Sequence, residues 1–178
     1  MKKKLFSLFK KPKSKSEKSP EGIGKDRELE ERIQAIRNNI LKTKNELDMT
    51  LDGVNKHELQ QLFLVENPDD SVYELFQCLL HILAGRAPDD MIEVNSANKP
   101  INDNWASCRK MIIHPDFLKE LRKLKEINLS EDHLKMIDTF KAKRYELTNS
   151  LFILACYMIT MGECDRLYNK TINYLMSI

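Results

Sequence analysis

Residues 28–54 read ELEERIQAIRNNILKTKNELDMTLDGV. Apolar residues and threonines recur in this stretch at alternating steps of four and three, which is the heptad spacing of a coiled-coil seam. The seam positions are Leu29, Ile33, Ile36, Ile40, Thr43, Leu47, Thr50 and Val54. Charged side chains such as Arg37 and Lys44 fill the other faces. A helix with so narrow an apolar stripe needs a partner helix, and the two threonines predict only modest pairing.

The stretch 26–66 is therefore expected to form a coiled-coil-like helix, with a break near Gly53. The rest of the chain offers little matching helix to cover the seam. One hypothesis is thus that residues 28–54 pair with a coiled-coil protein or with a second copy of this chain.

The N-terminal segment 1–25 differs sharply from this helix in composition. It contains nine lysines and two glutamates, a net charge of +7, with several serines and prolines. Such a composition has little to bury, and we expect a disordered basic arm that seeks an anionic partner. Residues 1–13 could also form a short amphipathic segment with weak membrane affinity, although a solubilising or tubulin-contacting tail is the favoured interpretation.

Residues 67–178 are expected to form a small helical bundle that is closed by a long C-terminal helix. Pro68 and the acidic residues after it predict a helix start, and Gly85 predicts its end. Short helices are expected from about Asn104 to Ile113 and over 116–125, and Ser130 opens another. The last helix, from about Tyr145, is apolar on most faces in its first half, as in a central core helix. We expect no β-strand and assign the all-α class.

Composition narrows the range of possible functions. No apolar run is long enough to span a bilayer or to act as a signal peptide, so we expect a cytosolic protein. The four cysteines, Cys78, Cys108, Cys156 and Cys164, show no CxxC spacing and are expected to be free, buried thiols in helices. We expect no nucleic-acid partner.

The motifs of common enzyme classes are also missing from the sequence. Gly22-Ile23-Gly24-Lys25 lacks the spacing of a phosphate-binding loop, and no G-x-S-x-G occurs. Cys78 and His81 lie one helical turn apart, but no second pair completes a zinc site. We therefore expect no catalytic residue, no metal and no cofactor.

The order of these elements resembles a known family, the microtubule-binding domain at the tip of the dynein heavy-chain stalk, with part of the first stalk helix. The resemblance covers about residues 50–171. TLDGVNKHELQQLFLVENPDDSV (50–72) is similar to the approach to the tip, and YELFQCLLHILAG (73–85) to its first helix. NWASCRKMIIHPDFLKELRKL (104–124) carries the most specific match, around Trp105. EINLSEDHLKMIDTF (126–140) and ELTNSLFILACYMITMGECDRLYNKTI (146–172) resemble the last two elements.

The departures from the family pattern bear on the mechanism. Asp69 replaces the second proline of the family's proline step, and Tyr157 stands where the family usually has tryptophan. The segment between Phe140 and Thr148 is shorter than the family's loop. The sequence ends at Ile178, where the second stalk helix would begin, and it carries no motor ring. The resemblance thus implies static binding without ATP-driven force, and it leaves the nucleotide-regulated affinity of the family in doubt.

The resemblance implies a non-motor microtubule-binding protein of the cytoskeleton, in a cilium, flagellum axoneme or other microtubule array. Tubulin's surface is acidic, so a basic helical face would suit it. Six basic positions match the family's contact helices: Arg86, Arg109, Lys110, Lys135, Arg166 and Lys170. The alternative is a coiled-coil scaffold or adaptor in a dynein-related or ciliary complex, without direct tubulin binding.

Overall fold

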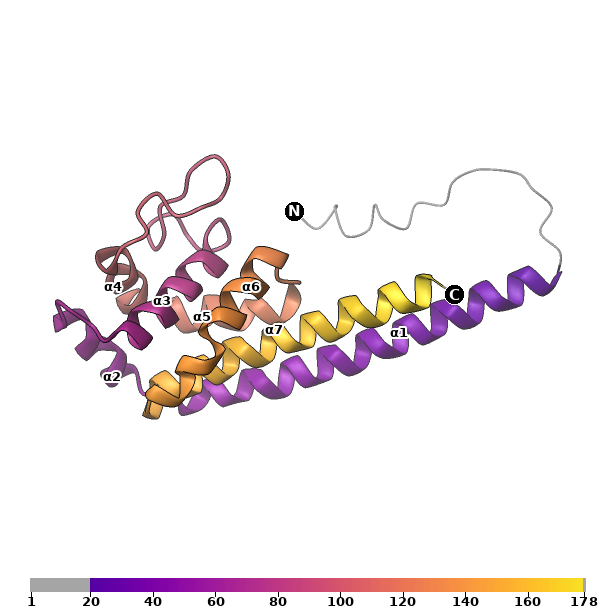
Figure 1. Ribbon diagram of the computed structural model, residues 1–178, viewed down its shortest axis with the longest axis horizontal. Coiled ribbons are helices and arrows are strands. Elements are labelled where there is room, and N and C mark those ends of the chain that lie inside the picture. The colour runs from indigo at the N-terminus through magenta and orange to yellow at the C-terminus, as the bar shows by residue number, and fades with distance from the viewer. Residues whose placement is uncertain (1–19, 178) are drawn as a thin grey trace.

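The computed structural model describes residues 20–177, and two long antiparallel helices dominate it (Figure 1). Helix α1 (Pro20–Asp48) and helix α7 (Asn149–Met176) lie side by side. All other described elements lie between them in the chain and form a bundle at one end of the pair. We call the paired α1 and outer α7 the stalk, and we call residues 49–148 with the first half of α7 the tip bundle.

The tip bundle consists of short helices and turns. Its elements are η2 (Met49–Gly53), α2 (Lys56–Gln61), η3 (Leu62–Leu64), α3 (Asp70–Leu83), α4 (Trp105–Ile113), α5 (Phe117–Arg122), η4 (Lys123–Glu126), α6 (Glu131–Phe140) and η5 (Lys141–Glu146). Within residues 20–177 there is no strand, only an isolated bridge between Val94 and Pro100. The predicted all-α class, with a long N-terminal helix, a bundle and a long C-terminal helix, is confirmed.

The core forms where α3 and the first half of α7 meet the surrounding helices. Leu75, Phe76 and Leu79 on α3 have no exposed surface, and Leu154 and Met158 on α7 are equally well covered. Burial of these large apolar side chains supplies most of the stabilisation of the tip bundle. The apolar face of α7 therefore belongs to the core in its first half and to the stalk in its second half.

Helix ends in the tip bundle follow local sequence signals. The side chain of Asn104 caps α4 by accepting from the Ser107 N–H, at 2.9 Å, and Ser130 caps α6 in the same way. Gly85 follows α3 with a φ of 71°, a left-handed conformation that glycine adopts without strain. The predicted starts at Asn104 and Ser130 and the predicted stop at Gly85 are thus confirmed.

The seam of α1 differs from the strict heptad prediction. Thr43 and Thr50 are exposed, whereas Lys44 is buried and Leu51 lies in the core. After Ile40 the next inward positions are Lys44 and Asp48, two successive steps of four. The buried side of the helix therefore shifts around its axis relative to a strict heptad. A straight helix of 3.6 residues per turn drifts away from a strict 3.5-residue repeat, and such an extra step of four corrects the drift. The assignment of Lys44 to an outer face is therefore wrong.

Three predicted boundaries also change. The first helix ends at Asp48, so the stretch 26–66 is not one helix but α1, η2, α2 and η3. Helix α1 begins at Pro20, so residues 20–25 are helical and not part of a disordered arm. The last helix begins at Asn149, after a 3-10 segment that ends at Glu146. The basic segment 1–19, with the predicted membrane contact of residues 1–13, lies outside the described residues.

The prediction that the seam lacks a covering helix within the chain is wrong, because α7 covers it. Arg37 on α1 donates a hydrogen bond to the Tyr168 hydroxyl at 3.3 Å, and Lys44 pairs with Asp165. Helix α7 thus runs back along α1 and covers the seam from within the chain.

Candidate partner-binding surface

Three of the six candidate basic residues, Lys135, Arg166 and Lys170, lie on α6 and α7. The Arg166 guanidinium donates to the Asp138 carboxylate at 2.8 Å and to the Leu134 carbonyl at 3.2 Å. These two hydrogen bonds connect α7 to α6. This hydrogen bond from Arg166 to Asp138 raises the pKa of Arg166. Lys135 belongs to the stretch of α6 that Arg166 contacts, and Lys170 lies one turn beyond Arg166 on α7. We call these three residues the α6–α7 group.

Lys135 and Lys170 are the open charges of this group. Both side chains are exposed, and neither has an acidic partner within 4.0 Å among the described side chains, residues 27–177. Arg166, by contrast, already shares its charge with Asp138. An acidic partner would thus meet two unneutralised ammonium groups beside one neutralised guanidinium.

Arg86 lies near the start of α6, after the end of α3. Its guanidinium donates to the Ile82 carbonyl at 2.6 Å, which covers the C-terminal end of α3. Its charge also helps to lower the pKa of the nearby His133 on α6. Arg86 lines a cleft beside the start of α6. Lys170 lies instead on α7, in the stalk.

Arg109 and Lys110 lie on α4 and have structural partners of their own. The Arg109 guanidinium donates to the Phe63 carbonyl at 3.1 Å and stacks over the Phe63 ring at 5.6 Å. Lys110 forms an ion pair with Glu93 at 2.9 Å, and the same contact lowers the pKa of Glu93. These contacts hold η3 and the loop after α3 against α4.

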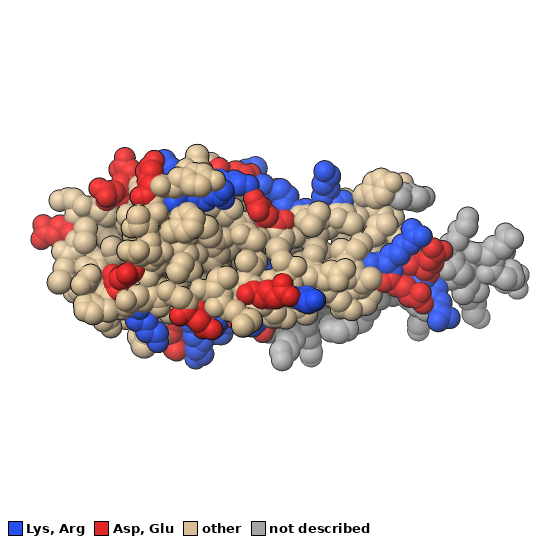
Figure 2. Space-filling model, turned by 90° about the horizontal axis from the view of Figure 1, so that it is seen from below, with Lys and Arg blue, Asp and Glu red and all other residues tan. Residues whose placement is uncertain are grey.

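The six residues do not form one continuous face. Helix α4 packs on α3, η3, α2 and α5, whereas α6 packs on α3, α7 and η5 (Figure 1). Helix α3 therefore lies between the α4 pair and the α6–α7 group. Figure 2 shows a further feature of one side of the tip bundle, where the centre has few charges and Lys, Arg, Asp and Glu alternate around the rim.

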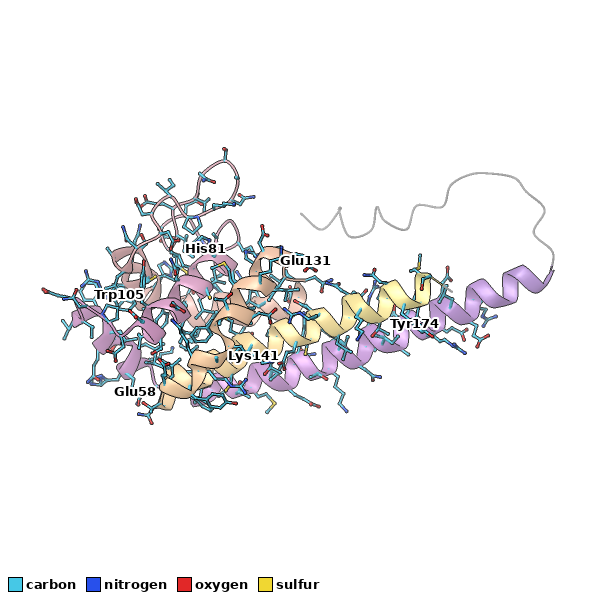
Figure 3. All side chains as sticks on the ribbon, in the orientation of Figure 1. Glu58, His81, Trp105, Glu131, Lys141 and Tyr174 are labelled. Atoms are coloured by element: carbon cyan, nitrogen blue, oxygen red, sulfur yellow. The ribbon has the colours of Figure 1, made fainter. Side chains whose placement is uncertain are left out.

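The far end of the tip bundle is apolar and acidic. Phe63 and Leu64 in η3 are exposed, and Glu66, Asp69 and Asp70 follow them at the surface. Trp105 anchors this end, because its indole N–H donates to the Val65 carbonyl at 2.7 Å (Figure 3). Phe76 and Phe117 beside it are buried, while Trp105 itself is half-buried.

A buried ion pair between the two stalk helices was missed by sequence reasoning. Lys44 on α1 and Asp165 on α7 are 3% and 1% exposed and bind each other. Asp165 also accepts from the Leu129 N–H at 2.9 Å, and Lys44 donates to the Ile127 carbonyl at 2.9 Å. Each of the two charged groups thus has a second hydrogen-bond partner besides the other, as a buried charge requires. An acidic residue on the apolar side of α7 was the available signal.

A second ionic cluster lies at the junction of stalk and tip bundle. Asp48, at the end of α1, pairs with Lys125 at 2.9 Å. Arg122 donates to the Asp48 carbonyl at 2.8 Å and to the Asp52 carboxylate at 2.6 Å. Buried Tyr157 donates its hydroxyl to the Leu121 carbonyl at 2.8 Å, so the same segment is also held from α7. These contacts fix the tip bundle relative to the stalk.

Comparisons with protein-family models, with curated proteins and with solved structures find no match to this chain. Within residues 20–177 no three His, Cys, Asp or Glu side chains are grouped so that they could hold a metal ion. No helix of that part of the chain is long and apolar enough to cross a membrane.

Proposed function

We propose that this protein is a non-motor microtubule-binding module that contacts the tubulin surface through one side of the tip bundle and the adjoining part of the stalk. One observation carries the proposal: the segment that resembles the dynein stalk tip, about residues 50–171, comprises a bundle of short helices followed by most of α7, and α7 packs antiparallel on α1. The family resemblance implies such a stalk-borne bundle. Sequence pattern and architecture therefore favour the same class of protein.

The α6–α7 group is the best candidate for the tubulin contact. Its two unpaired lysines, Lys135 and Lys170, can approach an acidic surface without first breaking an ion pair. The α4 pair is less suited, because Arg109 and Lys110 already hold η3 and Glu93. Exposed charges of this kind mainly set association rate and salt dependence. A module of this class would act on a microtubule array, such as that of a cilium or flagellum.

Co-sedimentation of the full chain with stabilised microtubules across a salt series tests the proposal. We expect saturable binding that weakens as salt rises, because exposed charges are screened. The double variant Lys135→Glu/Lys170→Glu should weaken binding about tenfold, since each reversed contact changes the binding free energy by roughly 0.5–1 kcal/mol.

A matched control keeps the net charge change the same. Lys42 on the outer side of α1 and Lys56 on α2 are both exposed and lie outside the α6–α7 group. The Lys42→Glu/Lys56→Glu protein should therefore bind as well as the wild type. If Arg109→Glu/Lys110→Glu alone abolishes binding, the contact surface is on α4 and the assignment to α6 and α7 is wrong.

A chain that lacks residues 2–19 separates the folded module from its basic segment. Saturable binding that survives this deletion supports a contact through the tip bundle or stalk. Binding that is lost with the segment would mean that a polycation merely adheres to an acidic polymer. Absence of binding by both chains would overturn the proposal and favour the scaffold or adaptor function.

A further inference from the structure

A cleft of about 610 Å³ lies between the end of α3, the loop around residues 97–99 and the start of α6. Its volume falls within the range of small-ligand sites. The tubulin proposal does not use this cleft. Figure 3 shows His81 on α3 and Glu131 at the first turn of α6, the two helices that form its walls.

Positively charged and hydrogen-bonding groups line the cleft from two segments. Arg86 and Lys99 come from the loop between α3 and α4, and Ser130 and His133 come from the start of α6. Asp132 is the one carboxylate in the cleft lining. His81 also lines the cleft, but its Nε2 is already engaged by Asp103 at 2.9 Å. The lining therefore offers two permanent positive charges against one negative charge.

Arg86 is held in place while keeping donors free. Its Nη1 donates to the Ile82 carbonyl at 2.6 Å, which fixes the plane of the guanidinium. No carboxylate lies within 4.0 Å of Arg86 among the described residues, and a guanidinium has five N–H donors in all. Although Arg86 is exposed as a residue, desolvation of the guanidinium lowers its pKa. A bound anion would offset that desolvation.

His133 has an unused nitrogen in the same place. Its Nδ1 is buried without a hydrogen-bond partner in the described part of the chain. Desolvation, Arg86 and His81 lower the pKa of His133, while Asp132 acts in the opposite direction. A buried polar atom without a partner is costly, so protonation of Nδ1 or a hydrogen bond to it would be favourable.

We propose that this cleft binds a phosphate group, with Arg86, Lys99 and His133 as its ligands. A guanidinium fork suits the oxygens of phosphate, and a nearby lysine adds a compact charge. The first turn of α6 contributes the positive end of a helix dipole. A phosphate oxygen near His133 also favours its protonated form, in which Nδ1 becomes a donor.

NMR titration of the isotope-labelled full chain with sodium phosphate, against sodium chloride of equal ionic strength, tests the proposal. We expect saturable shifts confined to amides around residues 86, 98–99 and 130–133, and an increase in the pKa of His133 when phosphate is present. Lys99→Gln, which changes an exposed side chain, should weaken phosphate binding at least fivefold, and Arg86→Gln at least tenfold. Lys56→Gln, which changes an exposed lysine on α2 outside the cleft, should leave it unchanged.

The same spectra show whether each variant is folded, so loss of binding is distinguished from loss of structure. Phosphoserine in place of inorganic phosphate shows whether a monoester is accepted as well. Shifts that chloride reproduces, or phosphate affinity that is equal in wild type, Lys99→Gln and Arg86→Gln, would overturn the proposal. Because no microtubules are present, the result is independent of the tubulin contact.

Discussion

Asp165 makes two polar contacts in the interior, where it is almost fully buried. One of its carboxylate oxygens binds Lys44, and the other accepts from the Leu129 N–H at 2.9 Å. Both charged groups are almost fully buried. The attraction within such a pair offsets the cost of removing both charges from water, so the pair fixes the helices more than it stabilises them.

Asp165→Asn is therefore expected to lower the free energy of unfolding by about 3–5 kcal/mol, because it leaves the Lys44 charge buried without its partner. The double variant Lys44→Met/Asp165→Asn should recover most of that loss. It removes both charges, and the asparagine oxygen can still accept from Leu129. Urea unfolding of the single and double variants measures the coupling. Additive losses would show that Lys44 and Asp165 do not act as a pair.

Because the thiols of Cys78 and Cys108 are buried, we expect the protein to lose stability at alkaline pH. Burial, followed by the charges of Glu74 for Cys78 and Asp103 for Cys108, raises each thiol pKa from 9.0 to about 12. Below pH 9 the thiols are protonated in both the folded and the unfolded chain. Between pH 9 and 12 only the unfolded chain ionises, so the free energy of unfolding falls by up to about 1.4 kcal/mol per pH unit for each thiol.

Urea unfolding under reducing conditions at pH 8, 9 and 10 checks this pH dependence. The Cys78→Ala/Cys108→Ala variant should be less stable at pH 8, because it leaves small cavities, but should show a flatter decline toward pH 10. Tyr157 remains in both proteins, and burial raises its pKa as well. Parallel declines in the two proteins would contradict the assignment to the thiols.

At the scale of elements, Gly85 is the position where backbone conformation decides the course of the chain. With its φ of 71°, it turns the chain from α3 into the loop that lines the cleft. A methyl group on Gly85 would lie 2.5 Å from the Asn98 Cβ, which cannot move without its backbone. Gly85→Ala is therefore expected to cost roughly 1–3 kcal/mol from backbone strain alone and to shift the loop.

Gly162→Ala on α7 is the matched control. There the added methyl meets the end of the flexible Ile137 side chain at 3.1 Å, and the helix gains from losing a glycine. It should therefore cost clearly less than Gly85→Ala in urea unfolding. Hydrogen exchange should be faster over residues 95–99 in Gly85→Ala alone. Equal exchange in the two variants would mean that Gly85 does not position the loop.

Local signals predicted the elements better than the pairing between them. Asn104, Ser130 and Gly85 mark helix ends through their own backbone chemistry, and the helices begin or end there. Which residues of α1 face inward after Ile40 depends instead on the ion pair between Lys44 and Asp165, which are far apart in the sequence. A charge on an apparent outer face becomes an inward position only when its partner is known. No heptad count from α1 alone contains that information.

The candidate basic positions show the same limit. Sequence and resemblance selected six exposed or half-exposed cations, but they did not indicate that α3 would separate Arg109 and Lys110 from Lys135. Nor did they indicate that Glu93 and Asp138 would neutralise two of the six. The cleft beside α6 was missed because its walls come from segments about 50 residues apart, and only the fold brings them together.

At the scale of the whole molecule, the stalk is a closed antiparallel pair. Leu29, Ile33 and Ile36 on α1 are half-buried, and the outer half of α7 lies along the same helix. A seam that is already covered within one chain offers no reason for a second copy to pair through it. The premise for a homodimer through residues 28–54 is thereby removed, although other surfaces of the stalk stay available to partners.

The full chain is therefore expected to sediment as a monomer at tens of micromolar, and removal of residues 167–178 should change this. The truncation deletes the part of α7 that bears Tyr168, the partner of Arg37. It uncovers the apolar stripe of α1, which then has to pair with another chain to leave water. Sedimentation equilibrium of both proteins, with circular dichroism to show that the tip bundle stays folded, decides the point. A dimeric full chain, or a truncated chain that stays monomeric at the same concentration, would mean that α7 is not what keeps the α1 seam from self-association.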